Sequence, residues 1–323
     1  MRIFVTGGTG FIGTQLIKRL IADGHEVHAL GRSEGSREVV RLLGATPIVG
    51  SLADIDLWKE SLRGCDAVVH CAAPVEFWGP WERFENEIVT ATRHLADAAA
   101  AAHVPKFIHI SSESVLQDIE PIVNADETCP FPDKPNSHYG TAKMLAEMDL
   151  LKTKRAMAIV ILRPAFVWGE NSTAISEMLE RVKSGSFIWA DAGQAAFEAV
   201  HVQNLVEAIT LAVHKGTGTN VYFVTDNEES TFRDFFDHVF DAHGIRRPRV
   251  SLPSALIRAA ARVTEFLWTL LSIGSKPPIT RFEWAFIGMP RKYRVSKITN
   301  DLGYRPILSR KDGFQQMAMS KGT

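Results

Sequence analysis

Several features that mark particular classes of protein are scarce or missing in this sequence. Its 323 residues include three cysteines, Cys65, Cys71 and Cys129, and this odd number at these spacings predicts neither a disulfide framework nor a zinc site. We expect Cys71 to be a small core residue rather than a nucleophile. The histidines show no metal-ligand spacing, so we expect no bound metal. The formal net charge of −1 excludes the strongly basic surface that is typical of nucleic-acid binding.

Long hydrophobic runs are also missing, since no stretch of about 18 or more uncharged apolar residues occurs. The nearest approach, residues 253–274, is interrupted by Arg258, Arg262 and Glu265. An apolar strand pattern begins at Arg2, with no signal-peptide pattern before it. We therefore expect a soluble cytoplasmic protein with at most peripheral membrane contact.

What is present is the composition of a globular chain, with 46% hydrophobic and 23% charged residues. Short apolar runs alternate with segments of helical periodicity in the first half, and a late run at 221–224 is placed to rejoin them. The first six runs span residues 3–5, 27–30, 47–49, 67–70, 107–110 and 158–162. This alternation predicts an α/β fold, a doubly wound parallel sheet of the Rossmann type, because strands that are apolar throughout are covered on both faces.

A glycine-rich turn follows the first apolar run directly and opens the first helix. Its sequence is Gly7-Gly8-Thr9-Gly10-Phe11-Ile12-Gly13. Glycines at this place let the backbone turn tightly and approach a pyrophosphate, and the helix N-terminus offers unpaired N–H groups to it. We therefore predict a dinucleotide site formed by Gly7, Gly10, Phe11, Ile12 and Gly13.

The end of the second apolar run favours one dinucleotide over the other. NAD sites usually place an acid there for the adenosine ribose, whereas this sequence has Gly31 followed by Arg32. A guanidinium can bind a 2′-phosphate, so NADP is the favoured cofactor and NAD the alternative. The competing interpretation is that Arg32 is an ordinary solvated loop charge.

Tyr139 and Lys143 stand four residues apart at the start of a helical segment, which places them on one face. A phenol with a pKa near 10 is a poor acid–base group at neutral pH, and a nearby ammonium is expected to lower that pKa. By itself the pair is as well explained by a packing tyrosine beside a surface lysine.

Further motifs surround this pair in a fixed order. After the glycines come His70-Cys71-Ala72-Ala73, Ile110-Ser111-Ser112, the Tyr139/Lys143 pair and Leu162-Arg163-Pro164. In this order the chain resembles the extended short-chain dehydrogenase/reductase superfamily, of the NAD-dependent epimerase/dehydratase type, over essentially its whole length.

The resemblance implies a Ser-Tyr-Lys triad in an NAD(P)-dependent oxidoreductase. Ser112 would polarise the substrate carbonyl, with Ser111 the less favoured choice. Tyr139 would transfer the proton, and Lys143 would bind the nicotinamide ribose and hold the pKa of Tyr139 down. Besides the glycine turn and Arg32, the resemblance implies cofactor contacts from Leu52, Ala72, Ala73, Tyr139, Lys143, Pro164 and Val167.

Within the superfamily the sequence is most similar to the bacterial 3β-hydroxysteroid dehydrogenase-like branch. The segments that carry this similarity are residues 72–79, 163–169, 200–205, 222–226 and 302–306. That branch implies a hydroxyl–ketone interconversion on a sterol, a terpenoid or a long-chain 3-keto acid.

The sequence departs from the family pattern at a few positions. Ser51 stands where an acid usually contacts the adenine, so binding there must depend on the backbone near Leu52. Ile88 replaces an asparagine linked to an active-site helix kink and a proton path, and Ala91 replaces a glycine. The asparagine's absence puts that path in doubt but leaves the triad complete.

The expected organisation has two parts. Residues 1–165, with 200–225 rejoining them, form the dinucleotide-binding domain, and residues 166–199 and 226–323 form a smaller mixed substrate lobe. The assembly is left open, with a homodimer as one candidate.

Two apolar segments bear on the substrate. Phe77, Trp78, Trp81 and Phe84 form an aromatic cluster after the fourth run, and packing and a substrate lining explain it equally well. In residues 254–272, apolar side chains share one helical face and Arg258, Arg262 and Glu265 the other. That face either packs into the lobe or forms an apolar substrate wall that also touches a bilayer.

Two other functions remain as alternatives. One is a nucleotide-sugar epimerase or dehydratase on the same fold, which Gly31-Arg32 and the apolar segments disfavour. The other is a non-catalytic NADP sensor, which would be expected to lose the tyrosine or the lysine that this chain retains.

Overall fold

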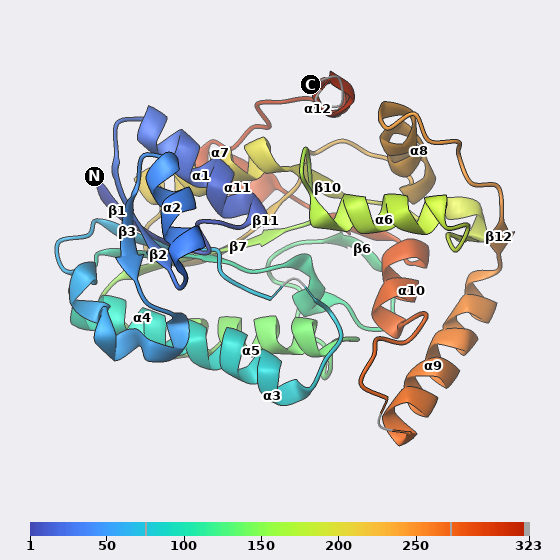
Figure 1. Cartoon of the computed structure of the whole chain (residues 1–323), viewed down its shortest axis with the longest axis horizontal. Coiled ribbons are helices and arrows are strands. Elements are labelled where there is room, and N and C mark those ends of the chain that lie inside the picture. Colours follow the sequence, from blue (N-terminus) through green and yellow to red (C-terminus); the bar gives the residue numbers. More distant parts are fainter. Residues whose placement is uncertain (75, 272, 320–323) are drawn as a thin grey trace.

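The computed structural model describes residues 1–74, 76–271 and 273–319, so Val75 and Ser272 of the segments above lie outside the described residues. A seven-stranded parallel sheet runs through its centre (Figure 1). Its strands in spatial order are β11 (Thr219–Val224), β7 (Ala158–Pro164), β5 (Lys106–Ile110), β4 (Ala67–His70), β1 (Arg2–Thr6), β2 (Glu26–Gly31) and β3 (Thr46–Val49). All seven predicted runs are strands of this sheet, which confirms the fold class.

Helices cover both faces because neighbouring residues of each strand point to opposite sides. Ile3 and Val5 pack against one helix layer, and Phe4 packs against the other. The first layer contains α1 (Phe11–Ala22), α2 (Glu34–Leu42), α7 (Val202–Lys215) and α11 (Ser296–Leu302). The second contains α4 (Ala91–Ala101) and α5 (His138–Lys152), preceded by the short α3 (Trp81–Phe84) and the 3₁₀ turns η1 (Leu52–Leu57) and η2 (Lys59–Leu62).

The remaining elements gather beside one end of the sheet, at the right of Figure 1. They include three parallel strand pairs: β8 (Phe166–Trp168) with β10 (Ala199–His201), β9 (Trp189–Ala190) with β12 (Ser251–Leu252), and β6 (Ile122–Ala125) with β13 (Arg291–Tyr293). Their helices are α6 (Thr173–Lys183), α8 (Phe232–Ala242), α9 (Ser254–Leu270), α10 (Arg281–Gly288) and α12 (Arg310–Met319). An aromatic core that includes Trp168, Trp189 and Phe197 holds much of this part together.

Residues Ser254–Leu270 form the expected helix, but most of its apolar face is exposed, which contradicts packing into the lobe and a substrate wall but leaves bilayer contact open. Its apolar side chains, including Phe266 and Leu270, are exposed, while Ile257, Ala261 and Glu265 are the buried residues. The expectation that this apolar face packs into the lobe or forms a wall of the substrate site is therefore wrong. The reason is that Glu265 accepts hydrogen bonds from the backbone N–H (2.6 Å) and Nε (2.5 Å) of Arg281, and these bonds fix the polar edge of α9 against α10. No helix among the described residues is long and apolar enough to cross a membrane.

Two buried histidines in the centre of the sheet predict an acid-sensitive fold. His70 lies between the hydroxyls of Thr6 (2.7 Å) and Thr92 (3.1 Å), and its ring is 5.4 Å from that of His109. Burial lowers the pKa of His70 to about 3 and that of His109 well below its usual value. The unfolded chain therefore binds more protons than the folded chain between pH 6.5 and 3, so stability falls as the pH falls through that window.

From His70 alone we expect the free energy of unfolding to decrease by about 2 kcal/mol between pH 7 and pH 5. Urea denaturation at the two pH values measures this change. His70→Asn should make the pH dependence shallower by about the same amount, and an identical slope in wild type and variant would contradict the assignment.

Candidate active site

The predicted glycine turn lies against the end of the neighbouring strand β4. Gly7 has a φ of +72°, and a Cβ there would lie 2.7 Å from the backbone nitrogen of Ala72. A Cβ on Gly13 would collide with the Gly7 carbonyl oxygen. These close approaches require glycine, and they place Ala72 beside the cradle as the sequence predicts.

The N-terminus of α1 is open above this cradle. Gly10 is the residue before the first helical turn, it is exposed, and no side chain caps the helix. Phe11 and Ile12 are half-buried in the first turn. Unpaired N–H groups at a helix N-terminus attract phosphate oxygens, so this surface fits the pyrophosphate of a dinucleotide.

At the end of β2, Arg32 is exposed and makes no ion pair with any residue that the structure describes. A side chain at Gly31 would meet the Cγ of Arg37 at 2.8 Å. The usual acid is therefore excluded by packing, and a second arginine, which the sequence analysis missed, stands at this strand end. Arg37 is itself ion-paired with Glu34, so Arg32 is the freer of the two guanidinium groups.

The other predicted cofactor residues lie along the same edge of the sheet, where parallel strands end. Leu52 begins η1 just after β3, and Ala73 follows β4. Pro164 ends β7, and Val167 lies in β8, where it pairs with Val200. Ser51 stands where the family pattern has an acid that contacts the adenine. Its hydroxyl donates a hydrogen bond to the Asp54 carboxylate (2.9 Å).

Ser112 and Tyr139 meet at the carboxyl end of β5. Ser112 follows the strand, and Tyr139 lies in the first turn of α5, where Ser137 caps the helix. Burial raises the pKa of Tyr139 to about 12, although a hydrogen bond with Ser112 acts in the opposite direction. Ser111 points elsewhere, since its hydroxyl donates to Glu147. The structure thus brings Ser112, and not Ser111, to the tyrosine.

Lys143 is buried one turn further along α5. Its Nζ donates to the carbonyl oxygen of Ile110 (2.8 Å) and lies 6.0 Å from the centre of the Tyr139 ring. Burial lowers the pKa of Lys143 to about 8, opposed by Cys71 and Glu147. The prediction that Lys143 lowers the pKa of Tyr139 is therefore wrong for the protein without a cofactor. Burial raises the pKa of Tyr139 and outweighs any influence of the Lys143 ammonium.

A buried ion pair that the sequence analysis did not single out supports this arrangement. The carboxylate of Glu147 accepts from Nε and Nη2 of Arg163, the latter at 2.6 Å, and also from Ser111. Arg163 belongs to the Leu-Arg-Pro motif, and Glu147 stands four residues after Lys143, on the same helical face. That spacing is the signal that could have revealed the pair.

Aromatic side chains border the tyrosine. The ring of Phe77 contacts Tyr139 edge-on (5.1 Å) and stacks on Phe282 of α10 (4.3 Å). Phe84, by contrast, is buried in a small core with Ile88. Packing thus explains Phe84, the substrate lining stays a prediction for Phe77, and Phe282, distant in sequence, is a neighbour of the cluster that the sequence analysis missed.

The active-site helix kink is present although Ile88 replaces the asparagine that the family pattern links to it. Residues Glu85–Thr90 form a π-helical turn (η3), with Ile88 buried inside it. A π-helical turn inserts an extra residue in the helix, and here it forms with Ile88 at the position of the family's asparagine.

The Cys71 thiol lies near the site but is unsuited to act as a nucleophile. Burial raises the pKa of Cys71 to about 12, which keeps it protonated and supports its role as a core residue. No cluster of metal ligands occurs among the described residues.

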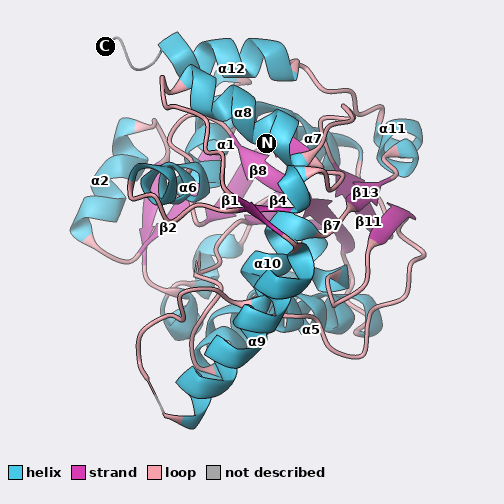
Figure 2. Cartoon of the chain, turned by 90° about the vertical axis from the view of Figure 1, so that its right-hand side faces the viewer, coloured by secondary structure: helices cyan, strands magenta, loops and turns pink. Residues whose placement is uncertain are grey.

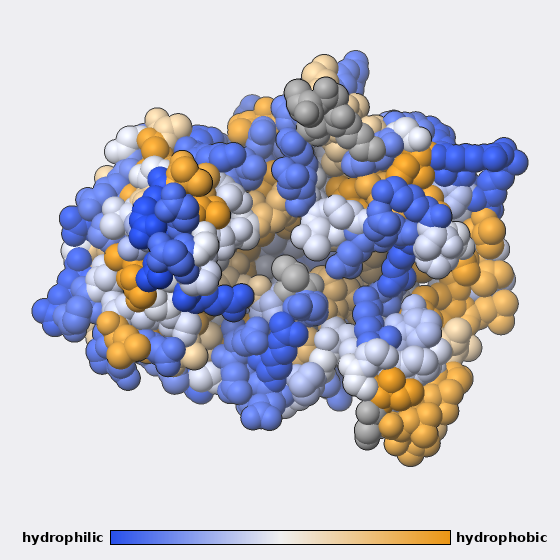
Figure 3. Space-filling view, viewed as in Figure 1, coloured by the Kyte–Doolittle hydropathy of each residue, from blue (hydrophilic) through white to orange (hydrophobic). Residues whose placement is uncertain are grey.

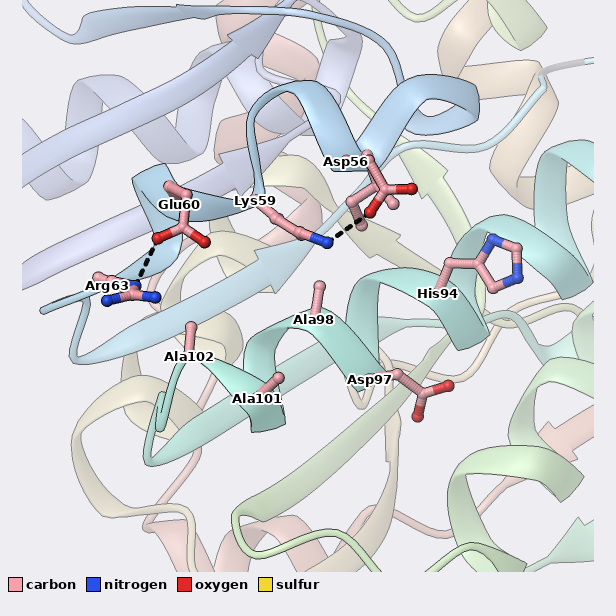
Figure 4. Close-up of a pocket in the computed structure, with 10 residues that line it drawn as sticks. Asp56, Lys59, Glu60, Arg63, His94, Asp97, Ala98, Ala101 and Ala102 are labelled. Atoms are coloured by element: carbon pink, nitrogen blue, oxygen red, sulfur yellow. Dashed lines mark hydrogen bonds and ion pairs between the residues drawn. The ribbon is translucent and has the colours of Figure 1, made fainter.

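A pocket of about 430 Å³ between η1, η2 and α4 holds none of the predicted site residues. Figure 4 shows two ion pairs in its lining, Lys59 with Asp56 and Arg63 with Glu60, each at 2.5 Å. Because no predicted catalytic or cofactor residue lines this pocket, we do not assign the active site to it.

Comparisons with known proteins agree with this geometry. The chain is 33% identical over 319 residues to a 4-hydroxy-2-methyl-3-oxo-4-farnesyl-3,4-dihydroquinoline-1-oxide ketoreductase of Stigmatella aurantiaca, covering 98% of this chain and 96% of the relative. It is 28% identical to a decarboxylating sterol-4-alpha-carboxylate 3-dehydrogenase of Dictyostelium discoideum, covering 98% and 99% of the two chains.

Among solved structures, gox2253 is similar with a TM-score of 0.81 at 28% identity, covering 98% of this chain and 96% of that one. A UDP-glucose 4-epimerase from Thermotoga maritima, at 22% identity and a TM-score of 0.76, shares the fold. The profile of the NAD dependent epimerase/dehydratase family matches residues 3–224. The chain therefore belongs to this family and is an enzyme of the extended short-chain dehydrogenase/reductase type.

Proposed function

We propose that this enzyme interconverts a ketone and a secondary alcohol on a largely apolar substrate, with Ser112, Tyr139 and Lys143 as its catalytic residues and NADP(H) as its preferred cofactor. The observation that carries the proposal is the meeting of Ser112 and Tyr139 beside an aromatic wall, at the sheet edge that also holds the glycine cradle. The ketoreductase and dehydrogenase names of the relatives support the same reaction class.

The catalytic side chains suit the reductive direction, in which the ketone becomes the alcohol. NADPH, when bound, supplies the hydride to the carbonyl carbon. Ser112 donates a hydrogen bond to the carbonyl oxygen, and Tyr139 gives that oxygen its proton. A pKa of about 12 keeps Tyr139 protonated at neutral pH, which is the form that a proton donor needs. Lys143, buried beside it, would hold the nicotinamide ribose.

The charges near the site disfavour a nucleotide sugar. A diphosphate needs cationic partners when it is buried. Glu113 directly follows the catalytic Ser112 in the chain. The Arg291 guanidinium lies 3.5 Å from the Glu113 carboxylate, and it also donates a hydrogen bond to the carbonyl oxygen of Phe286 (2.7 Å). Glu198 adds a second buried acid near Glu113. The Arg291 guanidinium thus already has protein partners, and the aromatic side chains of Phe77 and Phe282 beside Tyr139 favour an apolar ketone.

The test is a matched pair of substrates, with NADPH oxidation followed for a hydrophobic cyclic ketone and formation of the epimerised or dehydrated sugar, with NAD added, followed for a UDP-sugar. We expect turnover of the ketone, and a fall in kcat/KM for Phe282→Ala of about tenfold or more because the stacked wall is lost. Leu267→Asp, on the exposed face of α9, is the matched control and should leave that value unchanged in detergent-free solution. Turnover of the UDP-sugar alone would contradict the proposal.

The NADP preference gives a separate prediction. Wild type should bind NADPH more tightly than NADH, and Arg32→Ala should weaken NADPH binding by about tenfold to a hundredfold, since one charge-assisted phosphate contact is lost. NADH binding should barely change. Titration of both cofactors by fluorescence or calorimetry measures the ratio, and equal affinities in the wild type would refute the preference and leave NAD as the cofactor.

The remaining expectations stay predictions. The retained triad argues against a non-catalytic NADP sensor, and measured turnover would exclude it. A cytoplasmic location, a homodimer and the division into a dinucleotide-binding domain and a substrate lobe await direct measurement.

A further inference from the structure

The outer face of α9 is an unusually apolar surface. We call it the α9 crest and define it as Leu256, Val263, Phe266, Leu267, Leu270 and Leu271, whose exposed fractions range from 39% to 65%. Figure 2 shows α9 extending away from the sheet beside α10, and Figure 3 shows hydrophobic side chains concentrated at that corner. Exposed apolar patches of this kind mark sites of interaction.

Contacts on the opposite side of α9 fix the outward orientation of the crest. The opposite edge of α9 carries Ile257, Ala261 and Glu265, which pack against the protein, and Glu265 bonds twice to Arg281. Rotating α9 about its axis would bury the crest, but it would separate the buried Glu265 carboxylate from Arg281. A buried carboxylate without a partner strongly destabilises the fold. The fold therefore holds the apolar face outward.

The flank of the crest is positively charged. Residues 245–284 carry a formal charge of +5, but Arg247 pairs with Asp237 and Asp241 outside this segment, so the charge beside the crest is that of Arg258 and Arg262. Arg258 and Arg262 lie on the flank of α9 and line a groove of about 640 Å³ together with Ser254, Ala259 and Trp284. Among the described residues neither arginine has an acidic partner, and the Arg258 guanidinium lies over the Trp284 ring at 5.1 Å.

We propose that the α9 crest docks this enzyme on an anionic lipid bilayer, with α9 parallel to the surface. The crest side chains enter the boundary between headgroups and acyl chains, and Arg258 and Arg262 contact lipid phosphates, as expected for interfacial amphipathic helices. A second copy of the chain is disfavoured as the occupant. Twofold pairing of the crest would bring Arg258 and Arg262 of one copy toward the same arginines of the other.

Docking would also bring the bilayer near the active-site wall. α9 packs on α10, and Phe282 of α10 stacks on Phe77, which touches Tyr139. An apolar ketone dissolved in the bilayer would thus lie close to the site. The docking itself goes beyond the proposed reaction and does not depend on it, because binding is measured without turnover.

The experiment is flotation of the full chain with vesicles of phosphatidylcholine alone or mixed with phosphatidylglycerol. We expect binding to the mixed vesicles, weakened by salt. Phe266→Asp should lower the partition coefficient about tenfold to a hundredfold, because one large apolar side chain no longer enters the bilayer. Arg262→Glu should lower binding to the anionic vesicles and reduce its dependence on salt.

Leu42→Asp is the matched control, since Leu42 is 79% exposed on α2, away from the crest. It should bind vesicles like the wild type, and circular dichroism and NADPH binding establish that each variant is folded. Absence of binding to anionic vesicles by the folded wild type would overturn the proposal. So would equal losses for Leu42→Asp and Phe266→Asp, or light scattering showing that the crest is buried in a dimer that Phe266→Asp dissociates.

Discussion

Tyr139→Phe is expected to reduce turnover by about 10²- to 10⁴-fold or more while NADPH binding stays nearly intact. The substitution removes only the hydroxyl that would protonate the substrate oxygen. The ring remains, so its edge-on contact with Phe77 and its place in the first turn of α5 are kept. Single-turnover kinetics on a confirmed substrate, together with cofactor titration, separate the chemical step from binding.

Ser111→Ala is the matched comparison for the serine assignment. Ser112→Ala should lower kcat by more than the loss of its 3.2 Å hydrogen bond from the Ser114 N–H lowers stability, because Ser112 bonds to the tyrosine. Ser111→Ala should affect stability more than kcat, since its hydroxyl satisfies the buried Glu147. If Tyr139→Phe kept more than about half of the wild-type rate, the catalytic assignment would be wrong.

Glu147→Ala is expected to lower the free energy of unfolding by about 3–5 kcal/mol. The variant leaves the Arg163 guanidinium buried without its carboxylate, and a buried charge without a partner is strongly destabilising. It also removes a charge that favours the protonated form of Lys143, so the pKa of that lysine should fall further. Chemical denaturation measures the first effect, and the pH dependence of activity reports the second.

The control for Glu147→Ala is Glu180→Ala, the same substitution in the exposed pair that Glu180 forms with Lys183 on α6. Exposed pairs of this kind contribute about 0–1 kcal/mol. Replacing both Glu147 and Arg163 by apolar residues of similar volume should restore much of the lost stability. Equal destabilisation by Glu147→Ala and Glu180→Ala would show that the buried pair is not a major element of the fold.

The sheet and the cofactor cradle could be predicted from the sequence because both depend on local patterns. Each apolar run that was assigned to a strand is one, and Gly7 and Gly13 stand where a Cβ would collide with neighbouring backbone. Element ends were less accurate. The apolar run predicted at 3–5, for example, belongs to a strand that spans Arg2–Thr6.

The chemistry of Tyr139 could be predicted only in part. Spacing places Tyr139 and Lys143 on one helical face, but it does not say which partner the lysine selects. In the fold its ammonium donates to the Ile110 carbonyl oxygen, and the pKa of Tyr139 is raised instead of lowered. The choice between Ser111 and Ser112 likewise depends on how β5 meets α5.

By itself, then, the sequence determined the parallel sheet and the glycine cradle, because each follows from the order and spacing of residues close in the chain. Only the tertiary structure decided the partners of Phe77 and Glu147 and the direction in which α9 faces. Periodicity identifies which side chains share a helical face, but the contacts available on neighbouring elements determine which face turns inward. For α9 the bonds between Glu265 and Arg281 secure the polar edge, and the apolar face is left to the outside.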